Sequence, residues 1–434
     1  MERILRSCTR QCSPVPGVRA APSTCPPCLP LASRHYVCRS GSNNQSRRCT
    51  PAPHRRALYN IRSPDTALNK SDYGLMLPSL LTASPISFLH PTSEAPSVSL
   101  AIAAFFGLPA ALWAYKCLMM VVFQRKIIYM GYAPPGARTE SLGADVPMPK
   151  GLTCEELHLE SEKGITLYGI DVRKDVKQTT PYARKVVVVY LQGNAGNSLA
   201  RLPVFETLLH GIRPPSKPST QPALDVSIVA VAPRSYWKSS SRTPTQRGIL
   251  ADYTAALSYA TRRYPDSTVV LYGHSLGGAV AVCLAASLSA DDYPSVKGLI
   301  LENPFSSIGG MVQALYPQRW LPYRYLAPLA FDKWDAVTAV RETRPQSLLA
   351  RLSKDTLVLL SEKDEVVPTS MGMELYAALQ EKLAADAGDA SATNGLCRQV
   401  VIRGALHERA WLERQWVSEM GAYMDSISKC DKVS

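Results

Sequence analysis

From about residue 150 onward, the chain repeats short, continuous runs of β-branched and aliphatic residues. The clearest run is KVVVVYL at 185–191. Because it does not alternate with polar residues, it predicts a strand buried on both faces of a sheet. Similar runs follow at 226–232, 268–272, 298–301, 356–360 and 399–403. Helix-like stretches separate them, at 198–210, 245–264, 276–288, 370–383 and 413–427. This alternation predicts an α/β fold with a mostly parallel sheet and helices on both faces.

The predicted domain spans 150–430 and begins with a different pattern. Two alternating runs, 153–159 and 165–172, flank a turn that ends in Gly164 and predict an antiparallel hairpin. An aromatic and proline-rich stretch at 305–345 interrupts the strand–helix rhythm and is predicted to form a small cap-like insertion. Ordinary packing of a helical excursion is the alternative. Two shorter interruptions, one rich in Pro and Ser and one interpreted as a flexible loop, lie at 213–225 and 384–395.

Ahead of this domain, residues 98–123 read VSLAIAAFFGLPAALWAYKCLMMVVF. The segment carries one charge, Lys116, and exceeds the roughly 20 apolar residues that a helix needs to cross a bilayer. It predicts a single transmembrane helix, in which Lys116 lies close enough to one end to reach the interface. A buried helix of a soluble domain is the alternative.

Residues 1–97 form a leader of different composition. The whole chain has 48 basic and 35 acidic residues, and the leader contributes +8 of the net charge of +13. Rich in Arg, Pro and Ser and without a helical or strand period, the leader is predicted to be disordered. An organelle transit peptide is the alternative.

Because most of the basic excess lies in the leader, we expect no nucleic-acid binding. Its lone Cys25-Pro-Pro-Cys28 pair lacks a partner at zinc spacing, so we expect no metal site.

The charges that flank 98–123 predict an orientation. Residues 78–97 contain no Lys or Arg, whereas Arg125, Lys126 and Arg138 follow the segment. The positive-inside rule then predicts a cytosolic C-terminal domain on a single-pass protein. We expect an endomembrane, the endoplasmic reticulum first, with a mitochondrial membrane as the alternative.

The residues after the run 268–272 carry the chemistry. Gly273-His274-Ser275-Leu276-Gly277 follows a predicted buried strand and precedes an apolar helix. G-x-S-x-G in this context is typical of a tight turn that exposes a nucleophilic serine hydroxyl at the start of a helix. Ser275 is therefore the predicted nucleophile.

A serine nucleophile needs a base, and a base needs an acid to orient it. His407 is the only histidine after Ser275, and the chain order nucleophile, acid, histidine makes it the predicted base. The acid is expected after the strand 356–360, where we predict Asp364. Glu362 and Glu365 are its competitors.

An oxyanion hole needs two backbone N–H donors. We predict Leu276, directly after the nucleophile, and Asn194, in the loop after the strand 185–191. Ala195 is the alternative to Asn194. A phosphate-binding loop is not supported, because no Gly-Lys-Ser/Thr ending and no G-x-G-x-x-G is present. We expect no cofactor.

These segments resemble the α/β-hydrolase superfamily. More narrowly, the chain is similar to membrane-anchored fungal hydrolases of the bud-emergence-suppressor type and to animal abhydrolase-domain proteins. The resemblance covers about 98–434 and is carried by LQGNAGN, LYGHSLGGAVA, LENPFSS, SEKDEVVP and ALHE, which begin at residues 191, 271, 301, 361 and 405. It implies an α/β-hydrolase fold and a triad of Ser275, Asp364 and His407.

Two departures concern the pocket. The relatives usually carry His-Gly where this chain has Gln192-Gly193, and a Gly-rich turn where it has Arg234-Ser235-Tyr236-Trp237. The resemblance implies a serine hydrolase. Because a membrane anchor would place the site beside lipids and lipidated proteins, we expect it to cleave acyl esters or thioesters of a membrane lipid or an acylated protein. A peptidase or amidase of the same fold is the alternative within the enzyme class. The other alternative is a non-catalytic, membrane-bound interaction protein.

Overall fold

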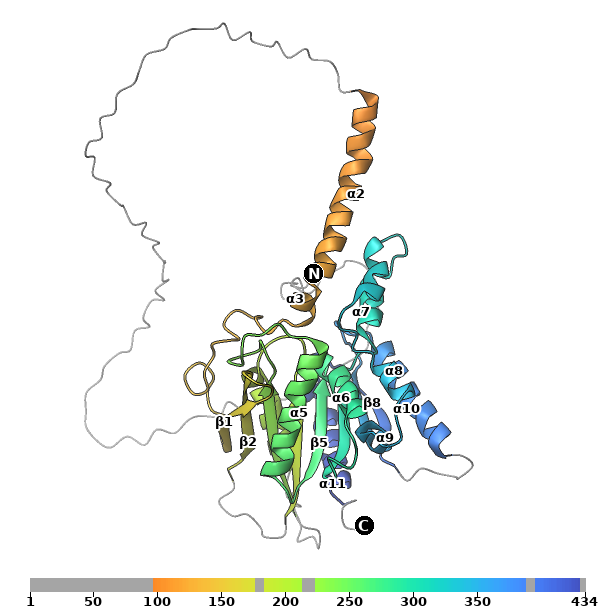
Figure 1. Ribbon diagram of the computed structural model, residues 1–434. Helices are drawn as coiled ribbons and strands as arrows, with labels where there is room; N and C mark the ends of the chain where they lie inside the picture. The colour runs from red at the N-terminus through yellow and green to blue at the C-terminus, as the bar shows by residue number, and fades with distance from the viewer. Residues whose placement is uncertain (1–96, 176–182, 213–222, 388–394, 430–434) are drawn as a thin grey trace, which may run out of the picture. The chain divides into compact units, whose positions relative to one another are not determined.

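Figure 1 shows the computed structural model, which describes residues 97–175, 183–212, 223–387 and 395–429. All of these belong to one compact unit, residues 96–434. Apart from Ser97, the predicted leader lies outside the described residues. So does most of each predicted interruption at 213–225 and 384–395.

A single eight-stranded sheet forms the centre of this unit, with the strand order β1-β2-β4-β3-β5-β6-β7-β8. The strands are β1 (Leu152–Glu160), β2 (Thr166–Lys174), β3 (Arg184–Leu191), β4 (Leu224–Ala232), β5 (Thr268–His274), β6 (Val296–Glu302), β7 (Thr356–Ser361) and β8 (Arg398–Ile402). Each of the eight predicted runs lies within or overlaps one of them. The expected sheet is confirmed.

Strand direction follows the sequence patterns. β1 and β2 pair antiparallel from Leu152 opposite Lys174 to Glu160 opposite Thr166, so the predicted hairpin is confirmed. β2 also runs antiparallel to β4, and the strands from β4 to β8 are all parallel. Every residue of β5 is buried, as its unbroken apolar run requires. The carboxyl ends of the parallel strands therefore meet at one edge of the sheet.

Helices cover both faces of the sheet (Figure 1). They are η2 (Ser198–Arg201), α4 (Leu202–Gly211), α5 (Gln246–Arg263), α6 (Leu276–Ser287), α8 (Ala336–Arg341), α9 (Leu348–Ser353), α10 (Thr369–Ala387), η4 (Ala410–Leu412) and α11 (Arg414–Ile427). On one face α4 packs beside α11; on the other, α5 packs beside α6, and α6 beside α8. The predicted helix at 198–210 begins as a 3₁₀ turn, with Asn197 capping it through the amide of Ala200.

The passage from β5 to α6 is unusually tight. A methyl group added to Gly273 would overlap the carbonyl oxygen of Gly277, and one added to Gly277 would overlap the carbonyl oxygen of Leu191. Only glycine allows these backbones to approach so closely. Between the two glycines, Ser275 adopts φ 56° and ψ −119°, a strained conformation for a residue with a side chain.

The apolar segment that precedes the domain forms α2 (Val98–Val122), a helix with no buried residue. Its length and composition make it a candidate membrane span. The short α3 (Gln124–Ile128) follows and joins it to the domain. There the amide of Met130 donates to the carbonyl of Asn194 at 2.6 Å, so the segment leaving α2 contacts a loop at the carboxyl edge of the sheet.

The predicted insertion at 305–345 divides into two parts. Residues 308–331 comprise α7 (Ile308–Leu315), a connection and η3 (Pro322–Leu329). We call these residues the cap. α7 has no buried residue, whereas the following α8 is buried through Ala336, Val337 and Val340 and packs on α6 and α10. The cap is therefore shorter than the sequence suggested, because the remainder belongs to the helical layer over the sheet.

The close approach at Gly277 makes a specific prediction about stability. Gly277→Ala should strongly destabilise the domain, since the new methyl meets backbone that has no room to shift. Gly421 in α11 is the matched control, because a Cβ there would have no atom within 4 Å. Gly421→Ala should raise stability by about 0.5–1 kcal/mol through helix propensity. Thermal unfolding of both variants tests this. An unchanged unfolding midpoint for Gly277→Ala would contradict the packing described here.

Candidate active site

Ser275 lies at the carboxyl end of β5 and immediately before α6. Its side chain makes no capping hydrogen bond to the helix, and its amide donates to the carbonyl of Glu302 at 2.9 Å. The strained backbone therefore presents the hydroxyl at the positive end of the α6 dipole, where developing negative charge is stabilised.

His407 and Asp364 come from the loops after β8 and β7, and the fold brings them together. His407 Nδ1 lies 2.7 Å from Asp364 Oδ2, and both side chains are almost completely buried. The other carboxylate oxygen, Asp364 Oδ1, accepts the amides of Val366 at 2.9 Å and Val367 at 2.7 Å. One carboxylate oxygen is thus held by backbone while the other faces the imidazole.

Glu362 and Glu365, the competing acids, contact backbone instead. Glu365 Oε2 accepts the amide of His407 at 3.0 Å, and Glu362 Oε2 accepts the amide of Gly404 at 2.7 Å. Both carboxylates tie the histidine loop to the loop after β7. Neither has the contact to the His407 ring that Asp364 makes.

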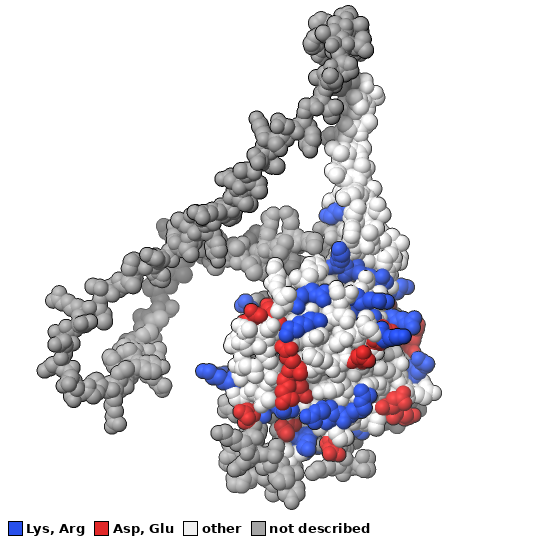
Figure 2. All heavy atoms as spheres, turned by 60° about the vertical axis from the view of Figure 1, so that its left-hand side comes forward, with Lys and Arg blue, Asp and Glu red and all other residues white. Residues whose placement is uncertain are grey.

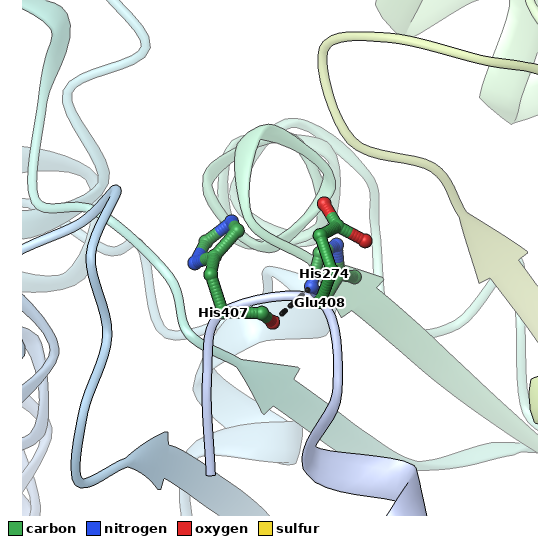
Figure 3. Close-up of side chains that lie close together, drawn as sticks. All are labelled: His274, His407 and Glu408. Atoms are coloured by element: carbon green, nitrogen blue, oxygen red, sulfur yellow. Dashed lines mark hydrogen bonds between the residues drawn. The ribbon is translucent and has the colours of Figure 1, made fainter. Parts of the chain in front are cut away.

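Two side chains hold the histidine loop through the carbonyl oxygen of His407. Asn303 Nδ2 donates to it at 2.9 Å, and His274 Nε2 lies 3.2 Å from it. The ring centroids of His274 and His407 are 5.0 Å apart. Since His274 directly precedes Ser275, the same contact places the His407 ring beside the serine turn. Figure 3 shows the contact between His274 and the backbone oxygen of His407.

An ion pair between a largely buried arginine and an exposed glutamate completes this arrangement. Arg201, at the end of η2, contacts His274 Nδ1 and pairs with Glu408 Oε2 at 2.8 Å. The guanidinium charge of Arg201 lowers the pKa of Glu408. Burial and the Arg201 charge hold the pKa of His274 well below its usual range. His274 is therefore neutral, with Nδ1 accepting from Arg201 and Nε2 donating to the His407 carbonyl.

His274, His407 and Glu408 also have the ligand types of a metal site, and their ligand atoms lie within 4.8 Å of one another (Figure 3). The guanidinium of Arg201 already contacts two of the three, and Asp364 holds Nδ1 of the third. A bound cation would compete with that guanidinium charge. These residues do not fit a metal.

The two predicted oxyanion donors lie on either side of Ser275. Leu276 follows it as the first residue of α6. The Asn194 loop passes close by, because a Cβ on Gly193 would lie 3.6 Å from the Ser275 Cβ. Met130 and the Tyr236 hydroxyl, at 3.0 Å, both donate to the Asn194 carbonyl. They fix the orientation of the peptide between Asn194 and Ala195.

Gln192 replaces the histidine of the related proteins at the start of this loop. The backbone amide of Gln192 donates to the Tyr253 hydroxyl at 3.1 Å. The nitrogen and the oxygen of its side-chain amide are both buried without a hydrogen-bond partner among the described residues. An unpaired buried amide costs about 1–3 kcal/mol. The departure seen in the sequence therefore leaves the loop without a side-chain bond at this position.

Neutral His274 makes stability depend on pH. The unfolded chain binds a proton at this histidine below about pH 6.5, whereas the folded protein does not. The unfolding free energy therefore falls as the pH drops below that value, by up to about 1.4 kcal/mol per pH unit. His274→Gln should flatten this dependence, measured as the unfolding free energy between pH 7.5 and 5.5. The matched control is His158→Gln, because His158 is exposed. An equal slope in wild type and His274→Gln would contradict the assignment.

Comparison with known proteins supports the fold and the resemblance. The family described as serine aminopeptidase, S33, matches residues 238–343. Protein bem46 of Schizosaccharomyces pombe is 27% identical over 58% of this chain and 74% of its own length. The alpha/beta hydrolase domain-containing protein WAV2 of Arabidopsis thaliana is 26% identical over 71% and 89%. Lysophosphatidylserine lipase ABHD12 of Mus musculus is 28% identical over 44% of each chain.

The sheet order, the helices on both faces, the tight serine turn and these similarities agree with one another. The chain has an α/β-hydrolase fold and is similar to the bem46 and abhydrolase-domain proteins.

Proposed function

We propose that this α/β hydrolase is a membrane-anchored serine hydrolase that cleaves acyl esters or thioesters. Ser275 is the nucleophile, His407 the general base and acid, and Asp364 the residue that orients the imidazole. The backbone amides of Leu276 and Asn194 stabilise the oxyanion. The substrate class is a membrane lipid or an acylated protein, with a lipid ester first.

The observation that carries this proposal is the buried 2.7 Å contact between His407 Nδ1 and Asp364 Oδ2 beside the strained turn of Ser275. A backbone strained by about 1–3 kcal/mol persists where the surrounding structure enforces it, and such residues cluster at active sites. A carboxylate on Nδ1 leaves Nε2 as the nitrogen that can take a proton from serine.

The proposed reaction has two acyl-transfer steps. Ser275 Oγ attacks the carbonyl carbon while His407 Nε2 takes its proton, and the oxyanion forms between the two amides. His407 then protonates the leaving alcohol or thiol, which leaves an acyl-enzyme on Ser275. Water, deprotonated by His407, releases the acid and restores the serine. Asp364 stabilises the imidazolium in both steps.

An ester substrate is favoured over a peptide by the charges around the site. The matching family is described as an aminopeptidase, and recognition of a free amine needs an available carboxylate. Glu408 pairs with Arg201, and Glu362 and Glu365 accept backbone amides. A relative is named as a lysophosphatidylserine lipase, which supports a lipid substrate. The candidate span α2 supports a membrane location for it.

The proposal includes an orientation. With Arg125, Lys126 and Arg138 after α2 and no Lys or Arg in residues 78–97, the catalytic domain faces the cytosol, at the endoplasmic reticulum. Protease treatment of sealed microsomes should remove the domain. Protection would reverse the orientation.

Kinetics on a soluble ester test the three roles. With 4-nitrophenyl butyrate, Ser275→Ala should abolish turnover, and Asp364→Asn should lower kcat by roughly 10³–10⁴-fold. Glu362→Gln and Glu365→Gln are the matched controls. They should lower it by about tenfold or less, because they loosen the histidine loop without leaving the imidazole unpaired.

Two outcomes would contradict the proposal. Turnover that survives Ser275→Ala would exclude the nucleophile, and a larger loss in Glu365→Gln than in Asp364→Asn would exclude the acid. No turnover in folded wild-type protein on esters, thioesters or lysophosphatidylserine would favour a binding protein.

A further inference from the structure

The cap packs against the side of α2 rather than over the sheet alone. The ring of Trp320 in the cap lies 6.1 Å from that of Trp113 in α2, measured between centroids. One turn further along, Lys116 Nζ lies 4.6 Å from the centre of the Tyr323 ring. Figure 1 shows α7 at the end of the domain from which α2 rises, and η3 is the part of the cap that packs on α2. The cap therefore reaches up the helix beyond its junction with the domain.

Polar contacts fix the end of the cap to α3, which directly follows α2. Gln124 donates to the carbonyl of Leu329 at 3.1 Å and accepts the amide of Phe331 at 2.7 Å. Arg125 Nε donates to Asp332 at 3.0 Å, and Asp332 in turn accepts the amide of Gln246. The amide of Gln124 is buried at this junction. The cap and α2 thus hold a defined relative position through paired polar groups.

The surface of the cap is apolar and basic. Leu315, Trp320, Tyr325, Leu329 and Phe331 are each more than half exposed. Between residues 303 and 331 the charged side chains are Arg319 and Arg324, and there is no Asp or Glu. Figure 2 shows Lys and Arg gathered over the end of the domain from which α2 emerges. Exposed aromatic side chains beside cations are typical of a membrane interface.

Helix geometry decides where this surface must lie if α2 crosses a bilayer. Crossing ~30 Å of hydrocarbon takes about 20 helical residues. Glu94, Pro96 and Ser97 precede the helix, so a span that begins at Val98 ends near Cys117. Trp113 then lies about one turn inside that boundary, and any later start places it deeper. Trp320, packed on Trp113, cannot remain in the aqueous phase.

We propose that the cap is a membrane-docking surface that lies in the interfacial layer of the leaflet at which α2 ends, with anionic phospholipid as its partner. This rests on the proposed function only in that α2 must cross the membrane. Arg319 and Arg324 would contact lipid phosphates, while Trp320, Tyr325 and Phe331 enter the headgroup–acyl boundary. Since the cap follows β6 at the edge that carries Ser275, the site would face the lipid from which an acyl substrate comes.

Tryptophan quenching tests the depth of the cap without using activity. Full-length protein is reconstituted in phosphatidylcholine–phosphatidylserine vesicles that contain lipids brominated near the headgroup. Trp237, Trp334 and Trp416 are fully buried, and Trp411 lies in η4, outside the cap, so Trp113 and Trp320 are the expected quenched residues. Trp320→Phe should remove about half of the quenchable emission, as Trp113→Phe should. Trp411→Phe, outside the cap, is the control.

The outcomes separate this proposal from the proposed function. Loss of quenching in Trp113→Phe but not in Trp320→Phe would overturn the docking surface and leave the membrane anchor intact. No quenching from either residue would overturn both the docking surface and the anchor. The quenching of Arg319→Glu is compared with that of wild type in vesicles with and without phosphatidylserine. Equal quenching of the two proteins in both kinds of vesicle would overturn the anionic partner. Turnover of 4-nitrophenyl butyrate should be the same in Trp320→Phe and wild type. If neither protein turns the ester over, the proposed hydrolase function is contradicted, but the docking surface is not.

Discussion

The structure depends on the close approach of α6 to the end of β3. Gly277 lies against the carbonyl of Leu191, and Gly273 lies against Gly277, so no side chain fits at either position. Ser275, between them, takes the strained backbone that points its hydroxyl out of the sheet. The same contact brings the loop after β3 close to the serine, since a Cβ on Gly193 would lie 3.6 Å from the Ser275 Cβ. The proposed nucleophile and the proposed oxyanion loop are therefore positioned by one packing constraint.

The segment that leaves α2 is built into this arrangement. Met130 donates to the carbonyl of Asn194, and Gln124 holds the end of the cap. A pull or tilt of α2 would thus be transmitted to the loop that supplies a proposed oxyanion donor. This gives the candidate span α2 a structural link to the proposed chemistry, where a flexible tether would give none.

Much of the fold could be predicted because the information is local. Unbroken β-branched runs mark the parallel strands, and the serine turn depends on residues at fixed spacing. The geometry between His407 and Asp364 agrees with the residues chosen from chain order. The Arg201–His274–Glu408 group was missed, because its members lie far apart in sequence and Arg201 resembles any helix-end arginine. Its one signal was the histidine directly before the serine.

The central claim is that Ser275 is an activated nucleophile, and a covalent adduct tests it most directly. Wild-type protein treated with a fluorophosphonate at neutral pH should carry one adduct, which peptide mass spectrometry locates on Ser275. Folded His407→Gln protein should react far more slowly, because the serine then lacks its base. An adduct on another serine, or equal rates for the two proteins, would contradict this account of the site.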